Sequence, residues 1–188
     1  MKKLFILGVI ALFTACSGGE NKTVETEPAT EKVATKDELQ LEITKMEQEL
    51  TNKMRTKFDD ELAKRVVTFY RDYAQNNPKD SITPEYLFKA GEVSIGLKEY
   101  DQAAGFFERI YNNYPDYNKR VESLYLVGFV YDEHANNYGK AKEYYEKVFA
   151  NHPDHGFADD AKASIETLGL TDEEIIKKFE AKQKEMAN

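Results

Sequence analysis

The sequence predicts an all-α fold built as an array of helical hairpins, and three observations support this prediction. Pro78, Pro115 and Pro153 recur at intervals of 37 and 38 residues, and an asparagine stands two positions before each of them. Apolar residues also recur 12, 8 and 5 positions before each proline, and these gaps place them on one face of a helix. The three columns are Val66, Ala103 and Ala141; Tyr70, Phe107 and Tyr145; and Tyr73, Ile110 and Val148.

Residues 1–15 are typical of a bacterial lipoprotein signal peptide. Two lysines near the start precede an apolar run of 12 residues, Leu4 to Ala15, which is shorter than the about 20 residues that a membrane-spanning helix needs. The following stretch LFTAC, residues 12–16, resembles a lipobox, although its leucine and phenylalanine lie four and three positions before the cysteine. The resemblance implies cleavage before Cys16 and lipidation of that cysteine, which would anchor the chain to a membrane.

The composition excludes several classes of partner and site. A length of 188 residues with 41% apolar residues supports one domain core with tails. The 34 acidic residues exceed the 26 basic ones, giving a net charge of −8, which argues against a nucleic-acid partner. Cys16 is the only cysteine, so we expect no disulfide, cysteine-rich zinc site or catalytic thiol in the folded domain. Residues 16–37 are rich in threonine, glutamate and lysine and predict a disordered, solvated tether.

Residues 38–57 predict an amphipathic helix. Leu39, Ile43, Met46 and Leu50 are spaced by four, three and four residues, which is the spacing of a coiled-coil seam. Lysines occupy the next two seam positions. We expect this helix to lie on the domain, with a short coiled coil as the alternative, and the oligomeric state stays open.

Residues 58–169 form the predicted repeat domain. The asparagine tolerates the left-handed conformation that ends helices, and the residue before a proline is pushed out of the α region, so Asn-x-Pro should stop each helix. Asp116 and Asp154 stand where an N-cap for the next helix belongs, and Thr83 takes that place in the first unit. Gly91 and Gly128 indicate helices that approach closely, which we expect to occur against Ala103 and Ala141.

Two copies of this pattern resemble the tetratricopeptide repeat. The family's leucine, small residue, glycine, tyrosine, alanine, phenylalanine and proline positions are matched in order from Leu87 to Pro115, and the second copy runs from Leu124 to Pro153. Lys98 stands where the family has a turn glycine, one residue is inserted before Tyr138, and the period exceeds the family's 34 residues. The resemblance covers residues 58–169 and implies a right-handed α-solenoid.

Residues 170–188 predict a C-terminal capping helix with a polar tail. Gly169 closes the preceding helix, which carries the apolar residues Ala161, Ile165 and Leu168, and Thr171 with Glu174 forms a capping box. Terminal units of such arrays are atypical because one face must meet water.

The sequence gives no catalytic, cofactor or metal site, and we predict that the protein is not an enzyme. The glycines of GEVSIGLK, residues 91–98, have phosphate-loop spacing but leucine replaces the required lysine. His152 and His155 lack the further ligands that zinc needs, and His134 lies elsewhere in the sequence.

The resemblance implies a binding groove lined by the first helix of each repeat. The matching positions are Phe88, Glu92, Ile95, Tyr125, Phe129 and Asp132. Aromatic residues beside carboxylates would suit a peptide with apolar and basic side chains. The alternative, equally weighted, is that the three aromatic residues only pack between repeats.

Together these features predict a lipid-anchored scaffold in the bacterial cell envelope that binds another protein or peptide. The combination resembles envelope lipoproteins of the BamD type, which help assemble outer-membrane barrels, and of the YbgF type. Serine after Cys16 indicates the outer membrane, and we expect the periplasmic face. The alternative is a structural or self-associating envelope lipoprotein without a peptide ligand.

Overall fold

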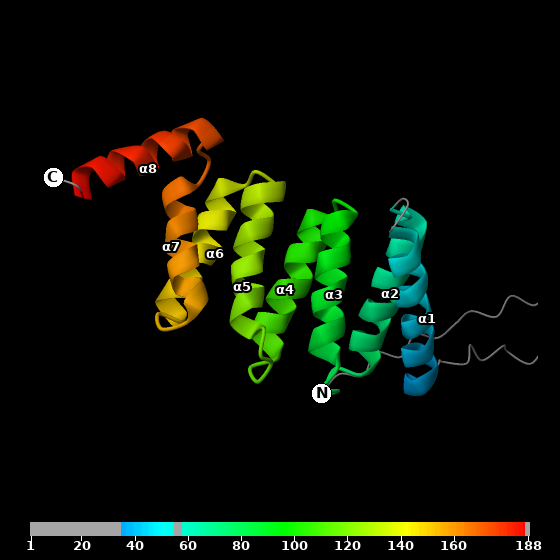
Figure 1. The fold of residues 1–188 in the computed structure, drawn as a ribbon. Helices are drawn as coiled ribbons and strands as arrows, with labels where there is room; N and C mark the ends of the chain where they lie inside the picture. Colours follow the sequence, from blue (N-terminus) through cyan, green and yellow to red (C-terminus); the bar gives the residue numbers. More distant parts are fainter. Residues whose placement is uncertain (1–34, 55–57, 187–188) are drawn as a thin grey trace, which may run out of the picture. The chain divides into compact units, whose positions relative to one another are not determined.

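The computed structural model describes residues 35–54 and 58–186, and all regular elements in these ranges are helices, as predicted. Figure 1 shows them following one another along the stack. The predicted signal peptide, Cys16 and residues 16–34 of the predicted tether lie outside the described residues. The elements are α1 (Lys36–Met54), α2 (Asp60–Asn76), α3 (Thr83–Gly96), α4 (Tyr100–Asn113), α5 (Arg120–Phe129), η1 (Val130–His134), α6 (Tyr138–Asn151), α7 (Gly156–Thr167) and α8 (Asp172–Met186).

Successive helices pack as hairpins, α1 with α2, α3 with α4 and α5 with α6, and each hairpin contacts the next. One apolar core runs through the stack and includes the predicted columns from Val66 to Val148, which are at most 2% exposed. Within the described part of the chain, no helix combines the length and apolar character that crossing a membrane requires.

The Asn-x-Pro motifs end helices as predicted, but by a different backbone geometry. Helices α2, α4 and α6 each end at the asparagine. The next residue leaves the helix with φ of −126°, −128° and −138° respectively. None of the three asparagines is among the described residues with a positive φ, so the left-handed conformation that we predicted for them is not used.

The predicted N-caps at Asp116, Asp154 and Thr83 are wrong. Arg120 N donates to Tyr117 O over 3.0 Å, so a turn separates the proline from α5 and moves the helix start beyond Asp116. Helix α7 is capped by the side chain of His155 instead of Asp154. Thr83 is already the first residue of α3, and its hydroxyl donates to the carbonyl oxygen of Asn77 over 2.6 Å.

Gly91 and Gly128 allow close packing within each hairpin, but against aromatic rings. A Cβ on Gly91 would lie 2.6 Å from Cζ of Phe107, and a Cβ on Gly128 would lie 2.7 Å from Cδ1 of Tyr145. The prediction that these glycines face alanines is therefore corrected. Each missing side chain leaves space for the ring that the second helix of the same hairpin supplies.

Helix α1 is the first helix of a hairpin with α2. Its seam residues are buried, with Ile43 only 1% exposed. Gln40 Nε2 donates to the Tyr73 hydroxyl over 2.9 Å, and Glu47 accepts from the Tyr70 hydroxyl over 2.6 Å and from Lys89 of α3 over 2.9 Å. The seam is thus covered within the chain, as expected for a helix lying on the domain.

The residue inserted before Tyr138 is accommodated by a π-helical turn, η1. Ala135 N donates to Val130 O, five residues earlier, over 3.0 Å, and Asn136 then takes a φ of 50°. Such π-helical turns add one residue to a helix without ending it. In the first copy the corresponding turn uses Lys98 with a φ of 61°, at the position where the related family has glycine.

Helix α8 follows the predicted features but packs little. Gly169 has a φ of 72°, and the capping box forms, since Thr171 N donates to Glu174 Oε2 over 2.8 Å. Phe179 is nevertheless 54% exposed. Figure 1 shows α8 extending away from α7, which suits a terminal unit.

Candidate functional site

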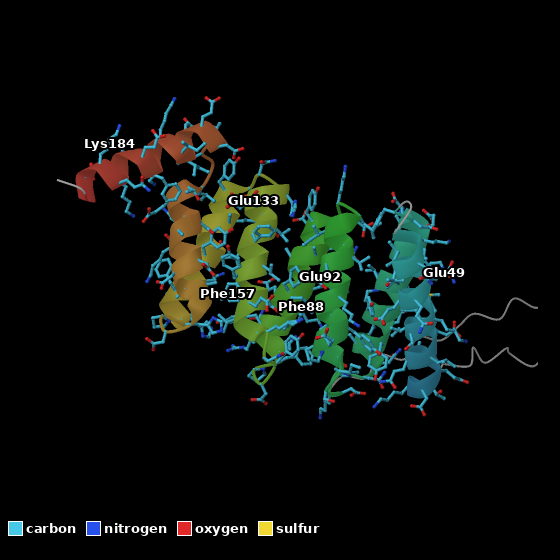
Figure 2. All side chains as sticks on the ribbon, in the orientation of Figure 1. Glu49, Phe88, Glu92, Glu133, Phe157 and Lys184 are labelled. Carbon is cyan, nitrogen blue, oxygen red and sulfur yellow. The ribbon has the colours of Figure 1, made fainter. Side chains whose placement is uncertain are left out.

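The six predicted groove residues lie on α3, α5 and η1 and form what we term the first-helix face. In this face Phe88 is buried, Glu92 is exposed, and the other four are half-buried: Ile95, Tyr125, Phe129 and Asp132. Figure 2 labels Phe88 and Glu92 on α3 and Phe157 on α7. Each of the two segments, α3 and α5 with η1, thus carries both an aromatic ring and a carboxylate among these positions.

Two of the three aromatic residues hold helices together. Phe88 packs edge-on against Phe107 with ring centroids 5.4 Å apart, and Lys119 Nζ lies 4.1 Å from the centroid of its ring. Tyr125 contacts the ring of Phe157 on α7 at 5.0 Å, and its hydroxyl shares a 3.2 Å hydrogen bond with Ser164 of α7. Both rings thus have packing partners in the array, and Glu92 is the one exposed member of the face.

Glu92 lies among charges of both signs. Partial burial is the main cause that raises the pKa of its carboxyl; the negative charges of Glu85 and Glu122 add to the rise, and the ammonium groups of Lys119 and Lys89 oppose it. Lys119 is shared, because its Nζ also lies 3.9 Å from Glu85 Oε2. The carboxylate of Glu92 is therefore raised in pKa chiefly because it is partly removed from water.

Asp132 repeats this arrangement one hairpin further on. Burial raises the pKa of its carboxyl and the charge of Glu133 adds to the rise, while a 3.3 Å hydrogen bond from the Tyr145 hydroxyl lowers it. In residues 35–54 and 58–186, no ion pair joins Asp132 or Glu92 to a basic side chain. A cation brought by a ligand would stabilise both carboxylates.

Comparison with known families matches the two copies. Residues 85–117 and 122–155 match the family described as Tetratricopeptide repeat. They correspond to α3 with α4 and to α5 with η1 and α6. Tetratricopeptide repeats are generally protein-interaction modules.

The search of curated proteins gave no match. Among solved structures, the chain is similar to a crystal structure of nearly identical tetratricopeptide-like repeats from Podosopora anserina, assigned to kinesin light chain. The sequences are 10% identical, the match covers 69% of this chain and 76% of the other, and the TM-score is 0.45.

The loops that carry Pro78 and Pro115 form a cavity that sequence reasoning missed. It has a volume of about 580 Å³ and lies between the α2–α3 and α4–α5 loops. Its walls include Pro78, Pro84, Pro115, Tyr114 and Tyr117. The repeated prolines were interpreted only as helix stops, although their spacing could have indicated that two equivalent loops lie side by side.

The three histidines have structural contacts in the repeats. The Tyr111 hydroxyl lies 3.1 Å from His152 Nε2, the His155 side chain caps α7, and His134 stacks on Tyr100 at 5.4 Å. Among the residues that the structure describes, no three histidine, cysteine or acidic side chains are grouped to hold a metal ion.

Proposed function

We propose that this chain is a lipid-anchored scaffold of the bacterial cell envelope, which binds a basic and apolar segment of another protein through the first-helix face. The observation that supports the binding mode is the pair of carboxylates, Glu92 and Asp132, whose pKa values are raised. A lysine or arginine of a partner would stabilise the charge of each partly buried carboxylate, while apolar side chains of the partner would cover the half-buried residues Ile95 and Phe129.

The proposed location rests on the N-terminal sequence. A twelve-residue apolar run ends at Ala15, directly before Cys16, and Ser17 follows the cysteine. We propose that the lipid on Cys16 holds the tetratricopeptide repeats at the periplasmic face of the outer membrane, in a role similar to that of BamD-type or YbgF-type lipoproteins in outer-membrane assembly or envelope organisation. The acidic character of the chain, with a net charge of −8, suits a basic partner.

Peptide binding tests the first-helix face. A helical peptide carrying lysines beside leucines should bind the chain, and the same peptide with glutamates in place of the lysines should not. The double change Glu92→Gln with Asp132→Asn should weaken binding by roughly tenfold or more, because both carboxylates lose their charge. Titration calorimetry measures the difference.

The matched control changes the same charges elsewhere. Glu61→Gln with Asp160→Asn alters exposed residues of α2 and α7 and should leave binding within about twofold. Binding of the lysine peptide should also strengthen as pH rises through the raised pKa values of Glu92 and Asp132, since the bound cation favours the ionised carboxylates. Equal weakening by both double changes would contradict the assignment of this face.

Cell fractionation tests the anchor. The full chain should sediment with outer-membrane vesicles, and Cys16→Ser should release it or leave it unprocessed, because no thiol remains to take the lipid. Metabolic labelling with a palmitate analogue should mark the wild-type chain alone. Labelling of the Cys16→Ser chain would show that the proposed lipidation site is wrong.

A further inference from the structure

Helix α8 carries apolar side chains that its own array does not cover. Ile176 is 57% exposed and Phe179 is 54% exposed. The ties of α8 to α7 are polar: Lys178 Nζ donates to the backbone oxygen of Glu166, and Lys182 Nζ lies 3.8 Å from Glu166 Oε2. Ile176 and Phe179, the apolar strip of α8, thus remain more than half exposed, and Phe179 also lines a cavity beside Lys178 and residues of α7.

The charges of α8 are arranged along its length. Its first turn holds Asp172, Glu173 and Glu174, and a basic residue stands in its last turn. Two such helices lying parallel would place their acidic turns together. An antiparallel pair would place each acidic turn beside the basic end of the other copy, which the helix dipoles also favour.

The register of these charges supports the antiparallel pair in detail. Glu173, Lys177, Glu180 and Lys184 are spaced by four, three and four residues, so they form one row along the edge of the apolar strip. When two copies are aligned antiparallel about a midpoint next to Phe179, Glu173 lies opposite Lys184 and Lys177 lies opposite Glu180. The same alignment brings the two Phe179 rings together at the centre.

We propose that α8 is a self-association element, through which two copies of this chain pair by antiparallel α8 helices centred on Phe179. The seam of α1 is already buried against α2, with Ile43 only 1% exposed, so α1 offers no comparable strip. A 15-residue helix is about 22 Å long. The surface area that one pair of such helices buries is smaller than the area buried in the interface of a stable dimer. The pairing is therefore weak and reversible.

Sedimentation of the chain from residue 17 onward, which keeps the whole helical array, tests the proposal. The weight-average mass should rise from that of one copy toward that of two as the concentration increases. Phe179→Ala should weaken association by about tenfold or more, since the central apolar anchor is lost. Leu41→Ala, which truncates a side chain of α1 that is 56% exposed, should leave it unchanged.

A charge exchange distinguishes a second copy from any other partner. A chain with Glu173→Lys and Glu180→Lys should not self-associate, and neither should a chain with Lys177→Glu and Lys184→Glu. An equimolar mixture of the two should associate at least as strongly as wild type, because every opposed pair is restored. Circular dichroism confirms that both chains are folded.

Three outcomes would overturn the proposal: a wild-type chain that stays a single copy at every concentration, a mixture that fails to regain association, or equal effects of Leu41→Ala and Phe179→Ala. The proposal is independent of the first-helix face. Glu92→Gln with Asp132→Asn should leave self-association unchanged, so failure of peptide binding and failure of pairing are separate results.

Discussion

Single residues set the distance between the two helices of each repeat. In the first repeat the ring of Phe107 lies directly over Gly91, and in the second the ring of Tyr145 lies over Gly128. Glycine costs about 1 kcal/mol against alanine in a helix interior. Here the absence of a Cβ lets a fully buried ring fill the centre of the hairpin.

Gly91→Ala should therefore destabilise the protein by about 1–3 kcal/mol, because the added methyl group overlaps Phe107. Gly105→Ala is the matched control, since a Cβ there has no neighbour within 4 Å, and it should stabilise by up to about 1 kcal/mol. Urea unfolding followed by circular dichroism measures both changes. A stabilising Gly91→Ala would contradict the packing described for this hairpin.

Asp80 links α1, α2 and the loop before α3. An ion pair with Lys36 and a 2.6 Å hydrogen bond from the Tyr73 hydroxyl lower the pKa of its carboxyl to about 2, against an ordinary value of about 3.9. Because the folded pKa is the lower one, Asp80 stabilises the fold above about pH 4, and this contribution is lost as pH falls from about 4 to about 2.

Asp80→Asn should consequently cost about 1–2 kcal/mol at neutral pH and progressively less as pH falls toward 2. Urea unfolding of both chains at a series of pH values measures this difference, and Asp160→Asn on the exposed side of α7 provides the control. A cost that stays constant between pH 7 and pH 2 would show that the lowered pKa of Asp80 does not contribute to stability.

At the residue scale, the sequence predicted burial better than capping. Tyr73, Phe107 and Val148 could be identified as core residues because helical spacing alone fixes which side of a helix they share. The caps at Asp116 and Thr83 could not, because the helix start depends on the turn that the loop backbone makes after each proline. The capping box at Thr171 was predictable, since both of its partners lie within one turn of helix.

At the scale of elements, α1 belongs to the array. Its seam residues were predicted from their spacing, but the spacing was equally that of a coiled coil, and sequence alone could not name the surface that covers them. The structure places them against α2, where Gln40 and Glu47 add hydrogen bonds to Tyr73 and Tyr70.

Ile43→Ala should for this reason destabilise the whole fold by about 2–5 kcal/mol, since its side chain is 1% exposed. Leu41→Ala, on the opposite and exposed side of the same helix, should change stability by less than about 0.5 kcal/mol. Thermal unfolding of both chains measures the contrast. If α1 unfolded separately from α2 to α7, Ile43→Ala would leave the main transition in place.

The two turns between paired helices show how elements tolerate departures from the family pattern. Lys98 takes a φ of 61° without being glycine, and the inserted residue of the second repeat becomes part of η1. Both departures were visible in the sequence. Their structural solutions were not, because an inserted residue can enter a π-helical turn or lengthen the loop. Likewise, a lysine in place of glycine can take the strained positive φ or the turn can change shape.

At the scale of the whole molecule, repeat spacing predicted the order of the stack, while the binding face was predicted only in part. The positions Glu92 and Asp132 followed from the resemblance. Their raised pKa values depend on Glu122, Glu133 and the surrounding burial, which sequence separation cannot give. The hydrogen bond between Tyr125 and Ser164 could not be predicted from the sequence either, because Ser164 lies on α7.

Stability in such an array depends on contacts between neighbouring units, so the two C-terminal helices should contribute very differently. Deleting residues 171–188 removes α8 and should change the free energy of unfolding by less than about 1 kcal/mol, because α8 is tied to the array mainly by polar contacts with Glu166. Deleting residues 153–188 also removes α7, which packs on α6 and contacts α5, and should cost several times more by uncovering Tyr125. Urea unfolding at low protein concentration, where two copies do not pair, measures both deletions. A large cost for the shorter deletion would mean that α8 covers the core, and it would leave less of Phe179 available for a second copy.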